Sequence, residues 1–131
     1  MAVSARRTLI ACYLGFEGLA IVSFWAAYLA SSVVSQWICP AGMEKVLGAF
    51  AFPDMVLLLP LTIGGVVTLL KQSRWAWTWL LLHCGASAYA TLWTLAAAWM
   101  DAGWTISALL MLPMMLASIG TVLLLRDEVS P

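Results

Sequence analysis

Charged residues are scarce in this sequence. Of its 131 residues, 9% are Asp, Glu, Lys or Arg, whereas 64% are hydrophobic, and the mean hydropathy is +1.00. A soluble domain carries about 25% charged residues, so this chain has too few to cover a surface that faces water. We therefore expect lipid to surround most of the protein, and the chain leaves no room for a separate soluble domain.

Paired cysteines and the common catalytic motifs are missing as well. The three cysteines, Cys12, Cys39 and Cys84, include no Cys-x-x-Cys pair, which excludes a thiol–disulfide oxidoreductase that works through paired thiols. The sequence also has no Gly-rich phosphate loop, no His/Cys spacing of a metal site and no Gly-x-Ser-x-Gly motif. We expect no metal, no cofactor and no nucleic-acid partner.

Long apolar segments are what the sequence does contain. We predict membrane-spanning helices over residues 8–30, 50–70, 75–98 and 104–125, because a bilayer core about 30 Å thick takes about 20 helical residues. A polar connection over residues 31–47 separates the first two, and short turns separate the others. The sequence thus predicts an all-α membrane protein of one domain, a four-transmembrane-helix bundle.

The basic residues are sorted to one end of these segments. Only Lys45 falls on one side, and the other five lie on the opposite side: Arg6, Arg7, Lys71, Arg74 and Arg126. Cytoplasmic loops carry the excess of Lys and Arg, so we expect both termini in the cytoplasm and a multi-pass protein of the cell's inner or plasma membrane. We expect Trp37, Trp99 and Trp104 to mark the outer interface, where tryptophans gather.

Two ionisable residues interrupt the apolar segments. Glu17 lies about 13 Å from the cytoplasmic end of the first segment, and His83 about 12 Å from the same end of the third. Ionisable groups inside a membrane are costly and are functional candidates by default. Because a histidine can hydrogen-bond a carboxylate, we expect both side chains in one interior cavity. A structural hydrogen bond that fixes helix register is the alternative.

Polar and aromatic residues continue the helix faces that carry these two groups. The face of His83 continues with Ser87, Thr91 and Thr94, and that of Glu17 with Tyr13, Phe24 and Tyr28. Such a lining suits a pocket for an amphipathic, largely apolar ligand. Tyr13, Ser87 and Thr91 therefore join Glu17 and His83 as candidates for ligand binding or proton handling.

Asp54 is a further candidate. It lies about 6 Å inside the second segment and directly follows Pro53. Proline and an acidic residue are both typical of the first turn of a helix, where the acid complements the helix dipole. A helix-start role for Asp54 therefore competes with a role in ligand binding.

A series of residues from the second segment onward resembles a known family. The series consists of Asp54, Leu59-Pro60, Lys71, Trp75, His83, Leu112-Pro113 and Arg126. It is similar to the EXPERA family, four-helix membrane proteins that include the sigma-two receptor and the sterol delta-eight isomerases. The resemblance covers roughly half of the chain and implies a lipophilic pocket lined by Asp54. The short first connection and the spacing from Trp75 to His83 depart from the family and argue against sterol isomerase activity.

Three functions remain open at this stage. The first is binding of a lipophilic small molecule, such as a lipid, an isoprenoid or a sterol-like compound. One acid and one base would also suffice for a proton shuttle such as a double-bond shift, so an enzymatic activity stays open. The second is a non-enzymatic accessory subunit or assembly factor of a larger membrane complex. The third is a small dimeric proton-coupled transporter that uses Glu17.

Overall fold

The computed structural model describes residues 3–129, with side chains up to Arg126, and this part of the chain is helical without a strand. Its elements are α1 (Ala5–Ala30), α2 (Ser32–Ile38), α3 (Glu44–Gly48), α4 (Ala51–Pro53), the π-helix η1 (Asp54–Leu58), α5 (Leu59–Leu70), α6 (Ala76–Met100), the 3-10 turn η2 (Ala102–Trp104) and α7 (Thr105–Val129).

Four helical stretches are long and apolar enough to cross a membrane. They are Ala5–Ala30, Glu44–Leu70, Ala76–Met100 and Ala102–Arg126. The segments predicted from the sequence coincide with these stretches apart from a few residues at their ends. The prediction of an all-α, four-helix membrane bundle is confirmed.

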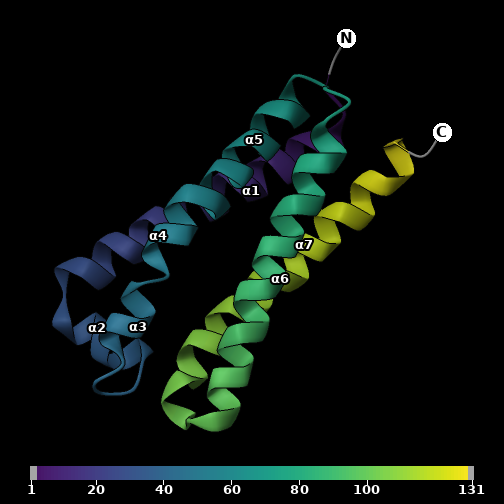
Figure 1. Cartoon of the computed structure of the whole chain (residues 1–131). Coiled ribbons are helices and arrows are strands. Elements are labelled where there is room, and N and C mark those ends of the chain that lie inside the picture. The colour runs from purple at the N-terminus through teal and green to yellow at the C-terminus, as the bar shows by residue number, and fades with distance from the viewer. Residues whose placement is uncertain (1–2, 130–131) are drawn as a thin grey trace.

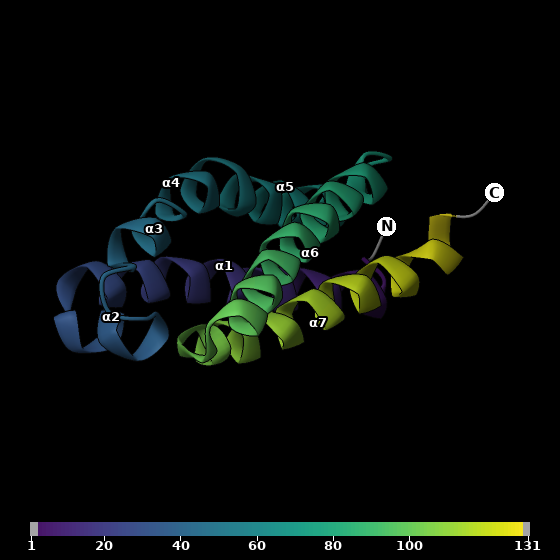
Figure 2. The ribbon, with the colours of Figure 1, turned by 60° about the horizontal axis from the view of Figure 1, so that its bottom comes forward.

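The long helices pack in chain order. α1 packs against α5, α5 against α6, and α6 against α7, as the ribbon shows (Figure 1). Both chain termini and the turn between α5 and α6 lie at one end of the bundle, which we call the termini end. The short helices α2 and α3 lie beside α1 at the opposite end, which we call the far end (Figure 2).

The connection after α1 is folded, not an open polar loop. Ser31 adopts an extended conformation that ends α1, and its hydroxyl accepts a 3.4 Å bond from the amide of Val34 to start α2. Two long-range bonds hold the segment in place. The Ser107 hydroxyl on α7 donates to the carbonyl of Ile38 at 2.6 Å, and Tyr28 donates to that of Glu44 at 2.7 Å. Residues 31–50 thus close the far end of the bundle.

The interior is layered along the long axis of the bundle. An apolar cluster at the termini end consists of Ile10, Ala11, Leu14, Leu69, Ala76, Leu80 and Leu125. A second cluster at the far end contains Ile21, Trp25, Tyr28, Ile38, Cys39, Leu47, Leu58 and Trp104. Between them on the four long helices lie the buried polar residues Glu17, Thr62, His83, Ser87, Thr91 and Ser118, which we call the polar layer.

Two of the three tryptophans predicted at the outer interface are exposed, and the third is buried. Trp37 and Trp99 are 71% and 93% exposed, as expected of interface residues, but Trp104 is only 3% exposed. Its ring packs edge-on against that of Trp93, with centroids 5.2 Å apart.

Candidate functional site: a buried Glu–His contact and an apolar cavity

The polar layer is centred on Glu17 of α1 and His83 of α6. His83 Nε2 lies 3.3 Å from Glu17 Oε1, and the side chains are 0% and 2% exposed. The predicted proximity of the two residues is confirmed, and neither faces lipid. Tyr13, one turn before Glu17, places its hydroxyl beside the carboxylate and beside Ser118 of α7. That hydroxyl also donates to the carbonyl of Met114 at 3.3 Å.

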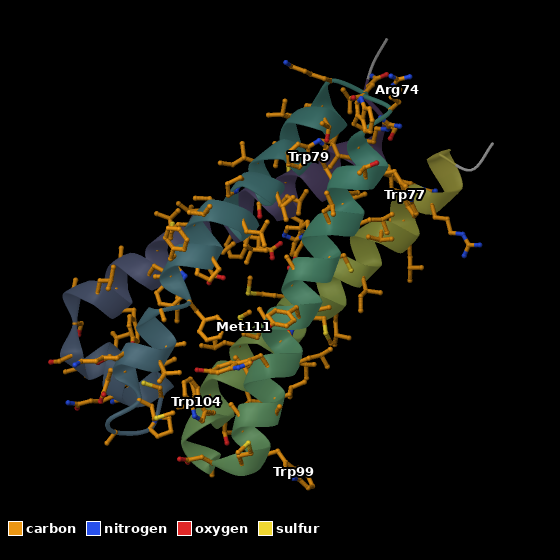
Figure 3. The ribbon with its side chains drawn as sticks, viewed as in Figure 1. Arg74, Trp77, Trp79, Trp99, Trp104 and Met111 are labelled. Carbon is orange, nitrogen blue, oxygen red and sulfur yellow. The ribbon has the colours of Figure 1, made fainter. Side chains whose placement is uncertain are left out.

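Glycines on α1 and α5 allow α5 to pack closely against α1 and against α6. A Cβ on Gly65 would lie 2.9 Å from Leu14 of α1, and one on Gly64 would overlap the ring of Trp79 of α6. Figure 3 shows Trp79 in the space between α5 and α6. A Cβ on Gly18 would stand 3.4 Å from Thr62 of α5. The helices pack closely at these contacts because the glycine on one helix has no side chain. Small residues at the contact are the usual basis of helix association in lipid.

The threonines and the other polar groups of this layer differ in hydrogen bonding. Thr62 and Thr91 each donate to the carbonyl four residues earlier, both at 2.8 Å. In contrast, the polar side-chain atoms of Glu17, His83, Ser87 and Ser118 are buried and lack a hydrogen bond of good geometry within the described residues. Their polar neighbours are one another and Tyr13: His83 lies 3.3 Å from Glu17, and the Tyr13 hydroxyl lies beside Glu17 and Ser118. The available chemistry of the layer therefore lies in these four side chains.

A cavity of about 220 Å³ lies nearer the far end of the bundle. Its wall is almost entirely apolar and combines aliphatic residues with four aromatic side chains, Phe24, Trp25, Phe50 and Trp93. Met111 of α7, labelled in Figure 3, belongs to the same wall. Among the described residues that line the cavity, Asp54 is the only one with a carboxylate.

Asp54 is held at the cavity wall by the π-helix η1. The amide of Leu59 bonds to the carbonyl of Asp54, five residues back, which widens the turn; such turns are frequent at functional sites. The Asp54 carboxylate accepts a 2.8 Å hydrogen bond from the indole Nε1 of Trp25. Asp54 follows the single turn of α4 and is the acidic residue in the first turn of η1, as the helix-start role predicts, and its carboxylate also bonds to a side chain of α1.

The structure separates the candidates into two places. The described lining of the cavity includes Asp54 and Thr94 but not Glu17, His83, Tyr13, Ser87 or Thr91. Trp25 lies eight residues beyond Glu17, about 12 Å further along α1. The expectation of one pocket around Glu17 and His83 does not hold for this cavity, whose described lining includes the apolar Ile21, one turn after Glu17, but neither of the two residues.

Several residues of the cavity wall could not be identified from the sequence. Ile38 and Leu47 come from the connection between the first two spans, which was expected to be a polar loop, and Phe50 lies at the predicted start of the second span. The folding of this connection over the far end brings them inward, and no periodic pattern marks them. Trp25 and Trp93 could have been predicted as wall residues, since tryptophans deep inside an apolar span pack against helices or line a cavity.

A metal role finds no support in the described part of the chain, where no group of three or more His, Cys, Asp or Glu side chains converges. Cys39 lies outside the spans and is 2% exposed. Burial raises the pKa of its thiol, which keeps it in the unreactive protonated form.

Comparisons of this chain with protein-family models, with curated proteins and with solved structures found no match. The resemblance to the EXPERA family therefore stays a prediction.

Proposed function

We propose that the protein binds a lipophilic small molecule, of the lipid, isoprenoid or sterol-like kind, in the cavity beside Asp54. One observation carries this proposal: an apolar, aromatic-lined cavity has a single carboxylate in its wall, and Trp25 holds that carboxylate at 2.8 Å. Apolar pockets with a few well-placed polar groups are the usual form of small-molecule sites.

The size of the cavity limits what it can enclose. Ligand pockets usually measure about 300–1,000 Å³, whereas this one measures about 220 Å³. It therefore accommodates part of a molecule, such as a small ring or a stretch of branched hydrocarbon chain. The remainder of the ligand would extend between the helices toward the surrounding lipid.

The Asp54 carboxylate defines the polar end of the ligand. The indole of Trp25 engages Oδ2, and the other oxygen of the carboxylate can accept a hydrogen bond from a ligand. A buried polar group left without a partner is costly, so the site favours a molecule that carries a hydroxyl or another donor. The EXPERA resemblance supports the same assignment, since the residue matched to the cavity acid of that family is Asp54.

Binding is a better proposal than isomerisation. A proton shuttle needs its acid and base within hydrogen-bond reach of the substrate. His83 and Glu17 lie outside the described wall of the cavity, so they are not placed to protonate a molecule bound there. We also propose that the termini end faces the cytoplasm, because the basic residues Arg6, Arg7, Lys71, Arg74 and Arg126 gather at that end.

The test is purification in mild detergent followed by mass spectrometry of the extracted small molecules. Ala90 lines the cavity, so Ala90→Phe should fill it and abolish the co-purified lipophile. Ala96, on the same helix, is exposed, and Ala96→Phe should leave the lipophile in place. Asp54→Asn should reduce retention of molecules with a donor group.

The same experiment discriminates between the functions. Equal retention of the lipophile in Ala90→Phe and Ala96→Phe would refute binding in this cavity. Stoichiometric protein partners in place of a lipophile would favour the accessory subunit, and a dimer that carries neither would favour the transporter.

A further inference from the structure

One side of the cavity wall reaches the outer surface of the bundle. The cavity of about 220 Å³ is not fully enclosed, and Leu110 of α7 lines it although this side chain is 52% exposed. The same wall contains Ala20 and Phe24 of α1, which are partly exposed. They follow Tyr13 by about two and three helical turns, so they share the face of α1 that contacts α7 through the Tyr13 hydroxyl. We call the surface between Ala20 and Phe24 on α1 and Leu110 on α7 the α1–α7 seam.

Two hydrogen bonds to α7 bound this seam. The Tyr13 hydroxyl donates to the carbonyl of Met114 at 3.3 Å, and the Ser107 hydroxyl donates to the carbonyl of Ile38 in α2 at 2.6 Å. Ser107 and Met114 are about 10 Å apart along α7 by helical rise, and Leu110 lies between them. The bonds therefore fix α7 on both sides of the position at which the cavity meets the outer surface.

The other sides of the cavity are closed more tightly. α1 packs against α5, and α6 against α7, much more extensively than α1 packs against α7. The 2.8 Å bond from Trp25 to Asp54 joins α1 to η1 at the wall. The rings of Phe50 and Trp93, with centroids 4.4 Å apart, close the wall where the chain before α4 meets α6. Among the described helices, the α1–α7 seam is thus the least obstructed route out of the cavity.

We propose that the ligand is a lipid with a hydroxyl, or a similar donor, on a single flexible hydrocarbon chain, and that the chain leaves the cavity through the α1–α7 seam beside Leu110. This inference deepens the proposed function and rests on it. The donor binds the Asp54 carboxylate, and the first part of the chain fills the cavity. A flexible chain can bend from the cavity into the seam, whereas a fused-ring molecule is rigid.

The depth of the seam suits a hydrocarbon chain. Leu110 lies within the apolar stretch Ala102–Arg126, about 12 Å from its start by helical rise. The seam therefore opens beside the acyl chains of the bilayer, not beside water. A chain that leaves the cavity there exposes no apolar surface to water, so no hydrophobic free energy is lost.

Photolabelling with derivatives of hexadecanol tests the route in the unmodified protein in micelles. One probe carries a diazirine next to the hydroxyl, and the other carries it at the middle of the chain. Mass spectrometry then identifies the labelled residues. We expect the first probe to label Trp25 or Phe50 in the cavity and the second to label Ala20 and Leu110 at the seam. Excess unlabelled hexadecanol should abolish both sets of labels.

Leu109 supplies the matched control for Leu110. It is 64% exposed and does not belong to the described wall of the cavity, so any label on it should persist in excess hexadecanol. Leu110→Trp should obstruct the seam and lower cavity labelling by the first probe roughly tenfold, which corresponds to the burial of about two methylene groups. Leu109→Trp should leave that labelling unchanged. Both positions are exposed, so we expect both variants to fold.

Two outcomes would overturn the proposal while the binding function stands. In one, hexadecanol competes with cavity labelling by the first probe, but the second probe labels Met55 of η1 or Ala86 of α6 and not the α1–α7 seam. In the other, Leu110→Trp and Leu109→Trp have equal effects. If excess hexadecanol removes no label of either probe, the single-chain ligand is refuted, and lipophile retention in Ala90→Phe decides the binding function separately.

Discussion

The indole of Trp25 donates a 2.8 Å hydrogen bond to Oδ2 of Asp54 and so joins α1 to the π-helix η1 at the wall of the cavity. Trp25 is 3% exposed, and its ring packs edge-on against Phe24 and Tyr28, with centroids 5.0 and 5.4 Å away. The aromatic neighbours fix the ring, and the ring fixes the carboxylate. The proposed ligand binding and the packing of the far end therefore depend on the same side chain.

Trp25→Phe keeps an aromatic ring but removes the N–H donor. The Asp54 carboxylate then loses a hydrogen bond to a charged acceptor, a loss of about 1–3 kcal/mol. We expect a lower melting temperature and weaker retention of the co-purified lipophile. Trp99, which is 93% exposed, supplies the control: Trp99→Phe should change neither quantity. Equal effects of the two substitutions would show that the hydrogen bond does not position Asp54.

The glycines of the helix contacts give a second prediction, with an internal control. Gly64→Ala would place a Cβ into the ring of Trp79, and Gly65→Ala would place one 2.9 Å from Leu14. Each overpacked position should destabilise the bundle by about 1–3 kcal/mol. Gly85 has no such neighbour within 4 Å, so Gly85→Ala should be neutral or stabilising by up to about 1 kcal/mol, since alanine favours the helix. Thermal melts of the three variants in one detergent measure these differences in stability.

The sequence predicted the four spans because their signal is local and strong. Apolar runs of about 20 residues are bounded by charges and turns, and helix periodicity placed Glu17 and His83 at the same depth. The position of the cavity could not be predicted this way. Its wall depends on the fold of residues 31–50 and on the π-helix at Asp54, both of which arise from tertiary packing and have no periodic pattern.

Topology is the third prediction. In a variant whose own cysteines are replaced, Ala41→Cys at the far end should react with a membrane-impermeant maleimide added from outside intact cells. Lys71→Cys at the termini end should react only after permeabilisation. Both positions are exposed, so access to the reagent, not burial, decides the result. Labelling of Lys71→Cys in intact cells would reverse the proposed orientation.

Native Cys39 should behave differently from Ala41→Cys although it lies two residues away. Its side chain is 2% exposed, and burial raises the pKa of its thiol. The thiolate is the reactive form, so Cys39 should resist the maleimide at neutral pH and react after unfolding. Rapid labelling of Cys39 in the folded protein would show that residues 31–50 do not close the far end.

The last prediction concerns the stability of the Glu17–His83 contact. His83→Gln leaves the carboxylate buried without its partner, and breaking a buried pair in this way costs about 3–5 kcal/mol. Glu17→Gln leaves a histidine that can remain neutral, so its cost should be much smaller. In the double variant both groups are uncharged, and most of the stability lost in His83→Gln should return. The free energies of unfolding of the four proteins form a cycle whose coupling term measures the contact.

Additive losses would mean that the two side chains do not interact, despite the 3.3 Å between Nε2 of His83 and Oε1 of Glu17. A large coupling would show that this contact holds α1 against α6.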